Sequence, residues 1–279
     1  MRVLAILMAA TAREAVRRKL VILALLVAAA FLGLYALAFH LGSIESHPLV
    51  TATERLMHRQ GQVIFTALGL YAANFLTALL AILASIDALS GDIASGAIQT
   101  LACKPLPRRQ IFLGKWLGFL LLLTLFQVVL LGGVFTVAEC FAGFLPPHPL
   151  HGALLLWLEM ALMLTVTMLW GTRFSTLANG VLSLGLFGMA FLGGFIEQIG
   201  TLTRHPGAVT VGILASLIMP SEALWRRASF LMQPPLASIF GLGPLTSTSV
   251  PSPLMVAYAA LYLLVTLALA LRLFSTRDL

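Results

Sequence analysis

Apolar stretches alternate with short polar segments along the whole chain. Six of these stretches have about the 20 residues that a helix needs to cross the hydrocarbon core of a membrane. They are expected at residues 20–41, 63–86, 111–138, 152–170, 176–199 and 254–274. The pattern therefore predicts an all-α, polytopic integral membrane protein with six transmembrane helices, in a single domain over residues 1–279.

Two further segments have a helical pattern but do not fit a membrane span. Residues 1–19 place Leu4 and Leu7 against a cluster of basic residues, which predicts an amphipathic helix in the membrane interface. Residues 200–253 form an outer loop whose apolar middle, 209–219, is too short to span alone and is expected to be interfacial or re-entrant. Ser221 is the expected N-cap of a short amphipathic helix on the outer surface. This helix would shield the span ends or contact a periplasmic, outer-face partner.

Composition excludes a soluble protein, because 60% of the residues are hydrophobic and only 10% are charged, against roughly 25% charged residues in soluble domains. The net charge of +7 lies in short clusters beside the apolar stretches. That distribution favours contact with membrane lipid over nucleic acid. The six histidines lack a partner at ligand spacing, so no metal site is expected.

Orientation follows from the basic residues near the ends of the spans. With the N-terminus inside, twelve of the 17 Lys and Arg residues lie on the cytoplasmic side. This bias predicts that both termini are cytoplasmic, in a multi-pass protein of the inner (plasma) membrane. The outer five are Arg55, Arg59, Arg204, Arg226 and Arg227.

The connector at residues 87–110, between the second and third spans, carries the most specific pattern. It reads DALSGDIASGAIQTLACKPLPRRQ, with a short stretch at 97–104 that could form one or two helical turns before its prolines. On charge alone, it is an ordinary basic connector that obeys the positive-inside rule.

The order of residues in this connector closely resembles the cytoplasmic loop of ABC-2 type transporter permeases. An acidic residue, a small Ser/Gly step, a short helix, a proline, a basic pair and a Gly-Lys at the start of the third span occur in that order. This family often has Glu before a Gly-Thr step, where this chain has Asp92 and Ala97. The whole chain is most similar to the subgroup with the nitrous oxide reductase maturation permease. The matching positions are Asp92, Gly96, Pro105, Arg108, Arg109, Gly114 and Lys115.

The resemblance implies the membrane subunit of an exporter, working as a homodimer whose copies each rest on a cytoplasmic ABC ATPase. It assigns the coupling to that ATPase to Asp92, Gly96, Pro105, Arg108 and Arg109. ATP and Mg²⁺ are expected on the partner, because the Gly-Lys at 114–115 is followed by Trp rather than by the Ser or Thr of a phosphate loop. No catalytic residue or cofactor is expected on this chain, and many classes of cargo remain open.

Glu159 falls near the middle of the fourth span, where burying a carboxylate costs roughly 2.5 to 3.5 kcal/mol on insertion scales. It is a candidate for the translocation path, or a packing contact within the protein. Glu197 is expected to be interfacial. An ion- or proton-coupled secondary transporter using Glu159 is the alternative function, although such carriers usually have interrupted spans in matching halves. A membrane-embedded enzyme would need a cluster of His, Asp or Ser at the same depth.

Overall fold

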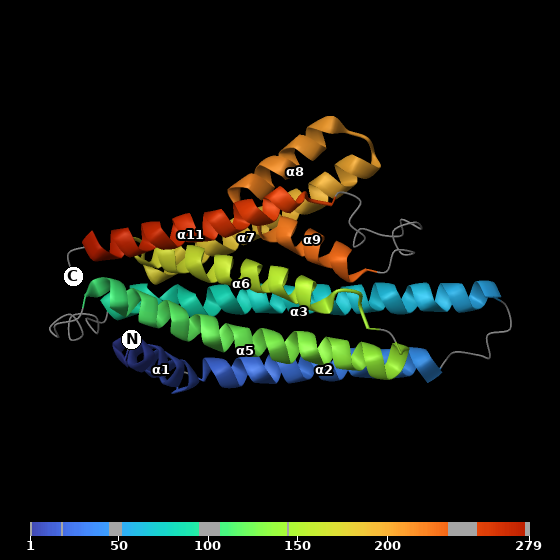
Figure 1. Cartoon of the computed structure of the whole chain (residues 1–279), viewed down its shortest axis with the longest axis horizontal. Helices are drawn as coiled ribbons and strands as arrows, with labels where there is room; N and C mark the ends of the chain where they lie inside the picture. The colour runs from blue at the N-terminus through green and yellow to red at the C-terminus, as the bar shows by residue number, and fades with distance from the viewer. Residues whose placement is uncertain are drawn as a thin grey trace.

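A computed structural model describes residues 2–17, 19–44, 52–94, 107–143, 145–233 and 250–276. The regular elements in these ranges are all α-helices (Figure 1). They are α1 (Arg2–Arg17), α2 (Leu20–Ile44), α3 (Ala52–Ala94), α5 (Arg108–Ala142), α6 (Pro149–Gly171), α7 (Thr176–Leu202), α8 (Pro206–Ile218), α9 (Ser221–Met232) and α11 (Pro253–Thr276).

The prediction of six spans is confirmed. Within the described residues, α2, α3, α5, α6, α7 and α11 are each long and apolar enough to cross a membrane. The central helix is α6, which lies between α3 and α5 on one side and α7 and α11 on the other (Figure 1). In the apolar stretch of α6, 72% of the residues are buried within the protein. The share is 17% in α2 and 17% in α11, so α2 and α11 lie on the outside of the bundle.

The start of α1 and the end of α11 lie at the same end of the bundle (Figure 1). An even number of crossings requires this arrangement, because each span moves the chain to the opposite membrane face. The end that carries the two termini is called the terminal end below. That it faces the cytoplasm stays a prediction.

The second span is longer than its apolar stretch indicated. We expected it to end at Ile86, but α3 has 43 residues and continues to Ala94, a length of roughly 65 Å at 1.5 Å per residue. Residues 87–94 therefore belong to a helix and not to a loop. Tertiary contacts explain the difference, since the polar side chains of this segment are bound by neighbouring helices, and such contacts override weak helix propensity.

The N-terminal helix α1 packs along α5 at a GxxxG sequence. A β-carbon added at Gly114 would lie 2.5 Å from Cβ of Leu7, and one added at Gly118 would lie 2.7 Å from Cβ of Thr11. No side chain fits at such distances, so the two glycines permit the close approach. Thr11 and Ala15 are buried in this contact. Whether α1 also lies in the membrane interface stays a prediction.

The outer loop contains the two expected short helices, but in a different setting. Helices α8 and α9 bend by 104° at their junction and form a broken span or re-entrant hairpin. We expected α9 to lie exposed at the outer surface. Its exposure is wrong, while the membrane face that α9 lies nearest stays a prediction. Helix α9 packs against α6, and most of its residues are buried, including Trp225 and Arg226. The predicted N-cap is also wrong: Pro220 holds that position, and Ser221 is the first helical residue.

Candidate functional site

The C-terminal part of α3 is joined to the start of α5 by a buried ion pair. Lys115 forms an ion pair with Asp92, and its Nζ also donates a hydrogen bond of 2.9 Å to the carbonyl oxygen of Ala88. Both charged residues are only 7% exposed. Because each charge loses its water, the two depend on one another, and removing either partner of such a pair is costly.

The same part of α3 is joined to α7 by polar side chains. The Thr176 hydroxyl donates to Oδ1 of Asp87 at 3.2 Å and lies 2.9 Å from the Ser90 hydroxyl. Nδ2 of Asn179 donates to the carbonyl oxygen of Ile86 at 2.9 Å. The end of α3 is therefore bonded to α5 on one side and to α7 on the other. We call residues 86–92 of α3, with the side chains bonded to them, the α3 junction.

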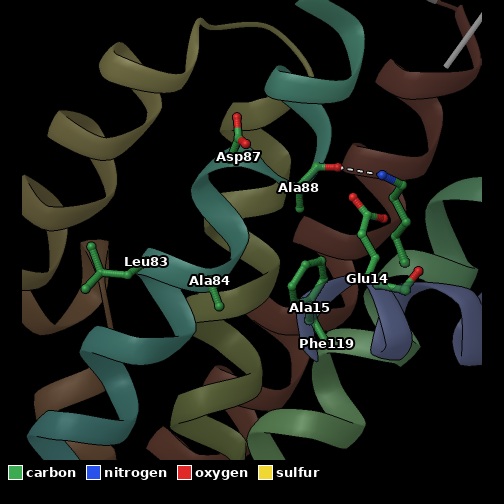
Figure 2. Close-up of a pocket in the computed structure, with 9 residues that line it drawn as sticks. Glu14, Ala15, Leu83, Ala84, Asp87, Ala88 and Phe119 are labelled. Carbon is green, nitrogen blue, oxygen red and sulfur yellow. Dashed lines mark hydrogen bonds between the residues drawn. The ribbon is translucent and has the colours of Figure 1, made fainter. Parts of the chain in front are cut away.

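A cavity of about 280 Å³ lies beside the α3 junction, between α1, α3 and α5. Figure 2 shows Glu14, Ala15, Ala84 and Phe119 around it, and the dashed line marks the hydrogen bond to the carbonyl oxygen of Ala88. Asp87 and Lys115 also line this cavity. It is therefore a partly charged space at the terminal end of the bundle.

A second polar group lies at the middle of the bundle. Nδ2 of Asn74 on α3 donates to Oε2 of Glu159 on α6 at 3.1 Å. Glu159 is 2% exposed, so in this conformation its carboxylate is held within the protein. The geometry provides the packing contact considered above, while a role in the translocation path stays a prediction.

A buried salt bridge fixes α9 against α7. Nη1 of Arg226 lies 2.7 Å from Oε1 of Glu197, and Nη2 donates to Oε2 at 2.8 Å. A longer contact of 3.3 Å runs from Nη2 to the Ser216 hydroxyl on α8. The pair therefore combines one hydrogen bond, from Nη2, with a close contact of opposite charges at Nη1. A charge-assisted hydrogen bond of this kind is stronger than a neutral one. Glu197 is 4% exposed, so its carboxylate is held within the protein, and its place at the depth of the membrane interface stays a prediction.

Comparison with known families decides the identity of the chain. Residues 4–279 match the family model described as ABC-2 family transporter protein. The chain belongs to the ABC-2 transporter family. A search of curated proteins returned no matching sequence. The match covers nearly the whole chain, so the family that the connector sequence suggested is confirmed. The protein is a multi-pass membrane permease of the ABC transporter class.

The structure brings together only part of the coupling set predicted for this ABC-2 permease. Asp92 lies in the α3 junction, bound to Lys115. Arg108 is half-buried in the first turn of α5, and Arg109 beside it is exposed. Gly96 and Pro105 lie outside the described residues. The coupling role of all five stays a prediction.

Sequence reasoning missed the cationic partner in each of the two buried ion pairs of the permease. Lys115 was recognised only as a position that matches the family, and Arg226 only as part of the polar face of a surface helix. A sequence signal existed for Lys115, which is a lone cation inside a long apolar stretch and so requires a buried partner. Nothing local indicated that Arg226 would pair with Glu197 on another helix.

Proposed function

We propose that this permease is the transmembrane subunit of an ATP-driven ABC-2 type exporter whose ATPase is a separate cytoplasmic polypeptide. The observation that carries the proposal is the family match over residues 4–279, in a chain whose sequence contains no phosphate loop. ATP and Mg²⁺ would bind to that ATPase. The same match favours an ATP-driven permease over the ion-coupled carrier that Glu159 suggested.

The contacts of Lys115 argue against a nucleotide-binding role for its Gly-Lys sequence. A phosphate-loop lysine must extend from a glycine-rich loop to the phosphates of the nucleotide. Lys115 instead lies within helix α5, is buried, and is bound to Asp92 and to the carbonyl oxygen of Ala88. In this Gly-Lys sequence, Gly114 allows α1 to pack closely against α5, and Lys115 forms the ion pair with Asp92.

The α3 junction supports a route for coupling. In the sequence, the connector from α3 to α5 follows directly after the segment that is bonded to both α5 and α7. A partner ATPase that pushes on this connector would therefore move three spans as a unit, because the polar bonds resist their separation. Rigid-body movement of helices in this manner is the usual form of such transitions. We assign the first contacts to Asp92, Gly96, Pro105, Arg108 and Arg109.

Assembly as a homodimer is part of the proposal. The outward faces of α2 and α11 are largely apolar, with 17% of each apolar stretch buried. Lipid or a second copy can cover such faces, and a path between two copies needs a second permease. In the inner (plasma) membrane, with both termini cytoplasmic, the α3 junction would face the ATPase, and the bent α8–α9 pair would face any periplasmic partner.

Purification tests the proposal. The isolated chain is expected to hydrolyse no ATP, and the chain recovered from native membranes is expected to carry a separate nucleotide-binding subunit. Intrinsic hydrolysis by a preparation that contains this polypeptide alone would contradict it. Crosslinking in native membranes would separate a homodimer from a pair with a different permease. Membership of the nitrous oxide reductase maturation subgroup stays a prediction.

A further inference from the structure

The end of α2, the end of α5 and the beginning of α3 lie opposite the terminal end (Figure 1). Between them is a cavity of about 440 Å³, lined by side chains from residues 38–42 of α2, residues 57–65 of α3 and Phe141 of α5. Three of the lining residues, Gly42, Met57 and Gly61, are exposed, so the cavity is open to the surroundings. We call it the aromatic cavity.

Three phenylalanine rings, one from each helix, line this cavity. Phe39 of α2 packs edge-on against Phe65 of α3 with ring centroids 4.8 Å apart, and its centroid lies 6.4 Å from that of Phe141 on α5. Met57 adds a thioether, which makes favourable contacts with aromatic rings. Because aromatic pairs are stabilised beyond the burial of their area, this wall favours a ring over a saturated chain.

One polar pair interrupts the apolar wall. Nε2 of Gln62 lies 3.2 Å from Nε2 of His58, one turn away on α3. Within the described residues, no other hydrogen bond engages the Gln62 carbonyl oxygen or Nδ1 of His58. A hydroxyl group both donates and accepts hydrogen bonds, so it can bond to either side chain of this pair.

The lining of the aromatic cavity favours a neutral ligand. Apart from the titratable His58, the described residues that line it include no Asp, Glu, Lys or Arg. Arg59, the next residue on α3, is exposed and does not line the cavity. A charged ligand would therefore lose its water without gaining a counter-charge from these residues.

We propose that the aromatic cavity binds a neutral aromatic molecule with a single hydroxyl group, its ring against Phe39, Phe65 and Phe141 and its hydroxyl beside His58 and Gln62. The predicted spans 20–41 and 63–86 place the cavity at a membrane interface, where amphipathic rings gather. The volume lies in the usual range for small-molecule sites. This site lies at the opposite end of the bundle from the α3 junction, and it requires no ATPase.

Photolabelling of the purified full-length chain in lipid vesicles tests the proposal. The probe is para-(hydroxymethyl)benzophenone. On irradiation its ketone oxygen takes a hydrogen atom from a nearby C–H group, and the two carbon atoms then bond. Peptide mass spectrometry should find adducts on residues that line the aromatic cavity, and their yield should saturate as the probe concentration rises.

Two glycines allow the cavity to be filled without a clash. A β-carbon added at Gly42 or at Gly61 meets no atom within 4 Å, although both residues line the cavity. Gly42→Leu and Gly61→Leu should each raise the half-saturating concentration about tenfold, because the added side chain takes the space of the ring. Gly132→Leu, also in open space but away from the cavity, is the matched control and should label like the unmodified chain. Thermal unfolding checks that each variant is folded.

A second probe tests the polar pair. In para-ethylbenzophenone a methyl group replaces the hydroxyl. The double variant His58→Leu, Gln62→Leu should shift the ratio of half-saturating concentrations of the two probes about fivefold toward the ethyl compound, because it removes one hydrogen bond.

Labelling that does not saturate, or that Gly61→Leu leaves unchanged, would overturn the proposal and leave partitioning into lipid only. An unchanged ratio in the double variant would overturn the assignment of the hydroxyl. If the unmodified chain gives no adduct on these residues, another part of the chain or a second copy fills the space, and the proposal is wrong. None of these outcomes bears on the proposed ATPase partner, because the assay contains no nucleotide.

Discussion

Replacing Lys115 with methionine tests the α3 junction most simply. Methionine keeps much of the length of the side chain but removes the charge and the donor. Asp92, which is 7% exposed, would then remain in the protein interior without its cation, and the carbonyl oxygen of Ala88 would lose a donor. Breaking a buried ion pair from one side costs about 3 to 5 kcal/mol.

Thermal unfolding of the purified chain in a mild detergent measures this cost. At about 2 to 4 °C per kcal/mol for a chain of this size, Lys115→Met should lower the Tm by at least about 6 °C. Arg109→Met is the control, since it removes a cation from the same helix at an exposed position. Surface changes of this kind usually alter stability by less than about 0.5 kcal/mol.

The double variant Asp92→Leu, Lys115→Met separates the charge effect from the loss of packing. Apolar pairs of similar volume can replace buried ion pairs without loss, so the double variant should recover most of the stability. An unchanged Tm for Lys115→Met would refute the buried pair. A double variant as unstable as the single one would show that the loss does not come from an unpaired Asp92 carboxylate.

Three further predictions concern α1, α9 and the topology. Gly118→Leu should destabilise the chain by about 1 to 3 kcal/mol in thermal unfolding, because a side chain there meets Thr11, whereas Gly132→Leu, with open space around it, should not. Arg226→Met should cost about 3 to 5 kcal/mol in the same assay, while the exposed Arg204→Met should have little effect; equal losses would contradict the buried salt bridge. In a variant that lacks the other cysteine, the exposed Cys140 should react with a membrane-impermeant reagent on intact cells. Reaction only after permeabilisation would reverse the orientation.

Much of the fold could be predicted from hydrophobic periodicity. A span must satisfy its own backbone hydrogen bonds in hydrocarbon, so an apolar stretch of sufficient length has few alternatives to a helix. The observed α6, Pro149–Gly171, therefore contains the whole predicted span 152–170. The rule fails where a helix continues beyond its apolar part, as α3 does through residues 87–94.

The polar contacts could not be predicted in the same way. Asp92 and Lys115 lie on different helices, and so do Glu197 and Arg226, which are 29 residues apart. A charge pattern read along the chain assigns such residues to a surface, because a single sequence does not show which distant partner neutralises them. That is why α9 was expected on the outer surface although most of its residues are buried.

The most direct measurement of the central claim, that the connector after α3 passes ATPase closure to the spans, is ATP hydrolysis and transport by the reassembled complex in vesicles. Gly96→Trp is expected to uncouple hydrolysis from transport while the complex still inserts and assembles, because a bulky side chain disturbs a close approach or a special backbone conformation. Gly96→Ala is the milder control. If Gly96→Trp leaves both activities at the level of the unmodified complex, the connector is not the coupling element, and it is an ordinary basic loop.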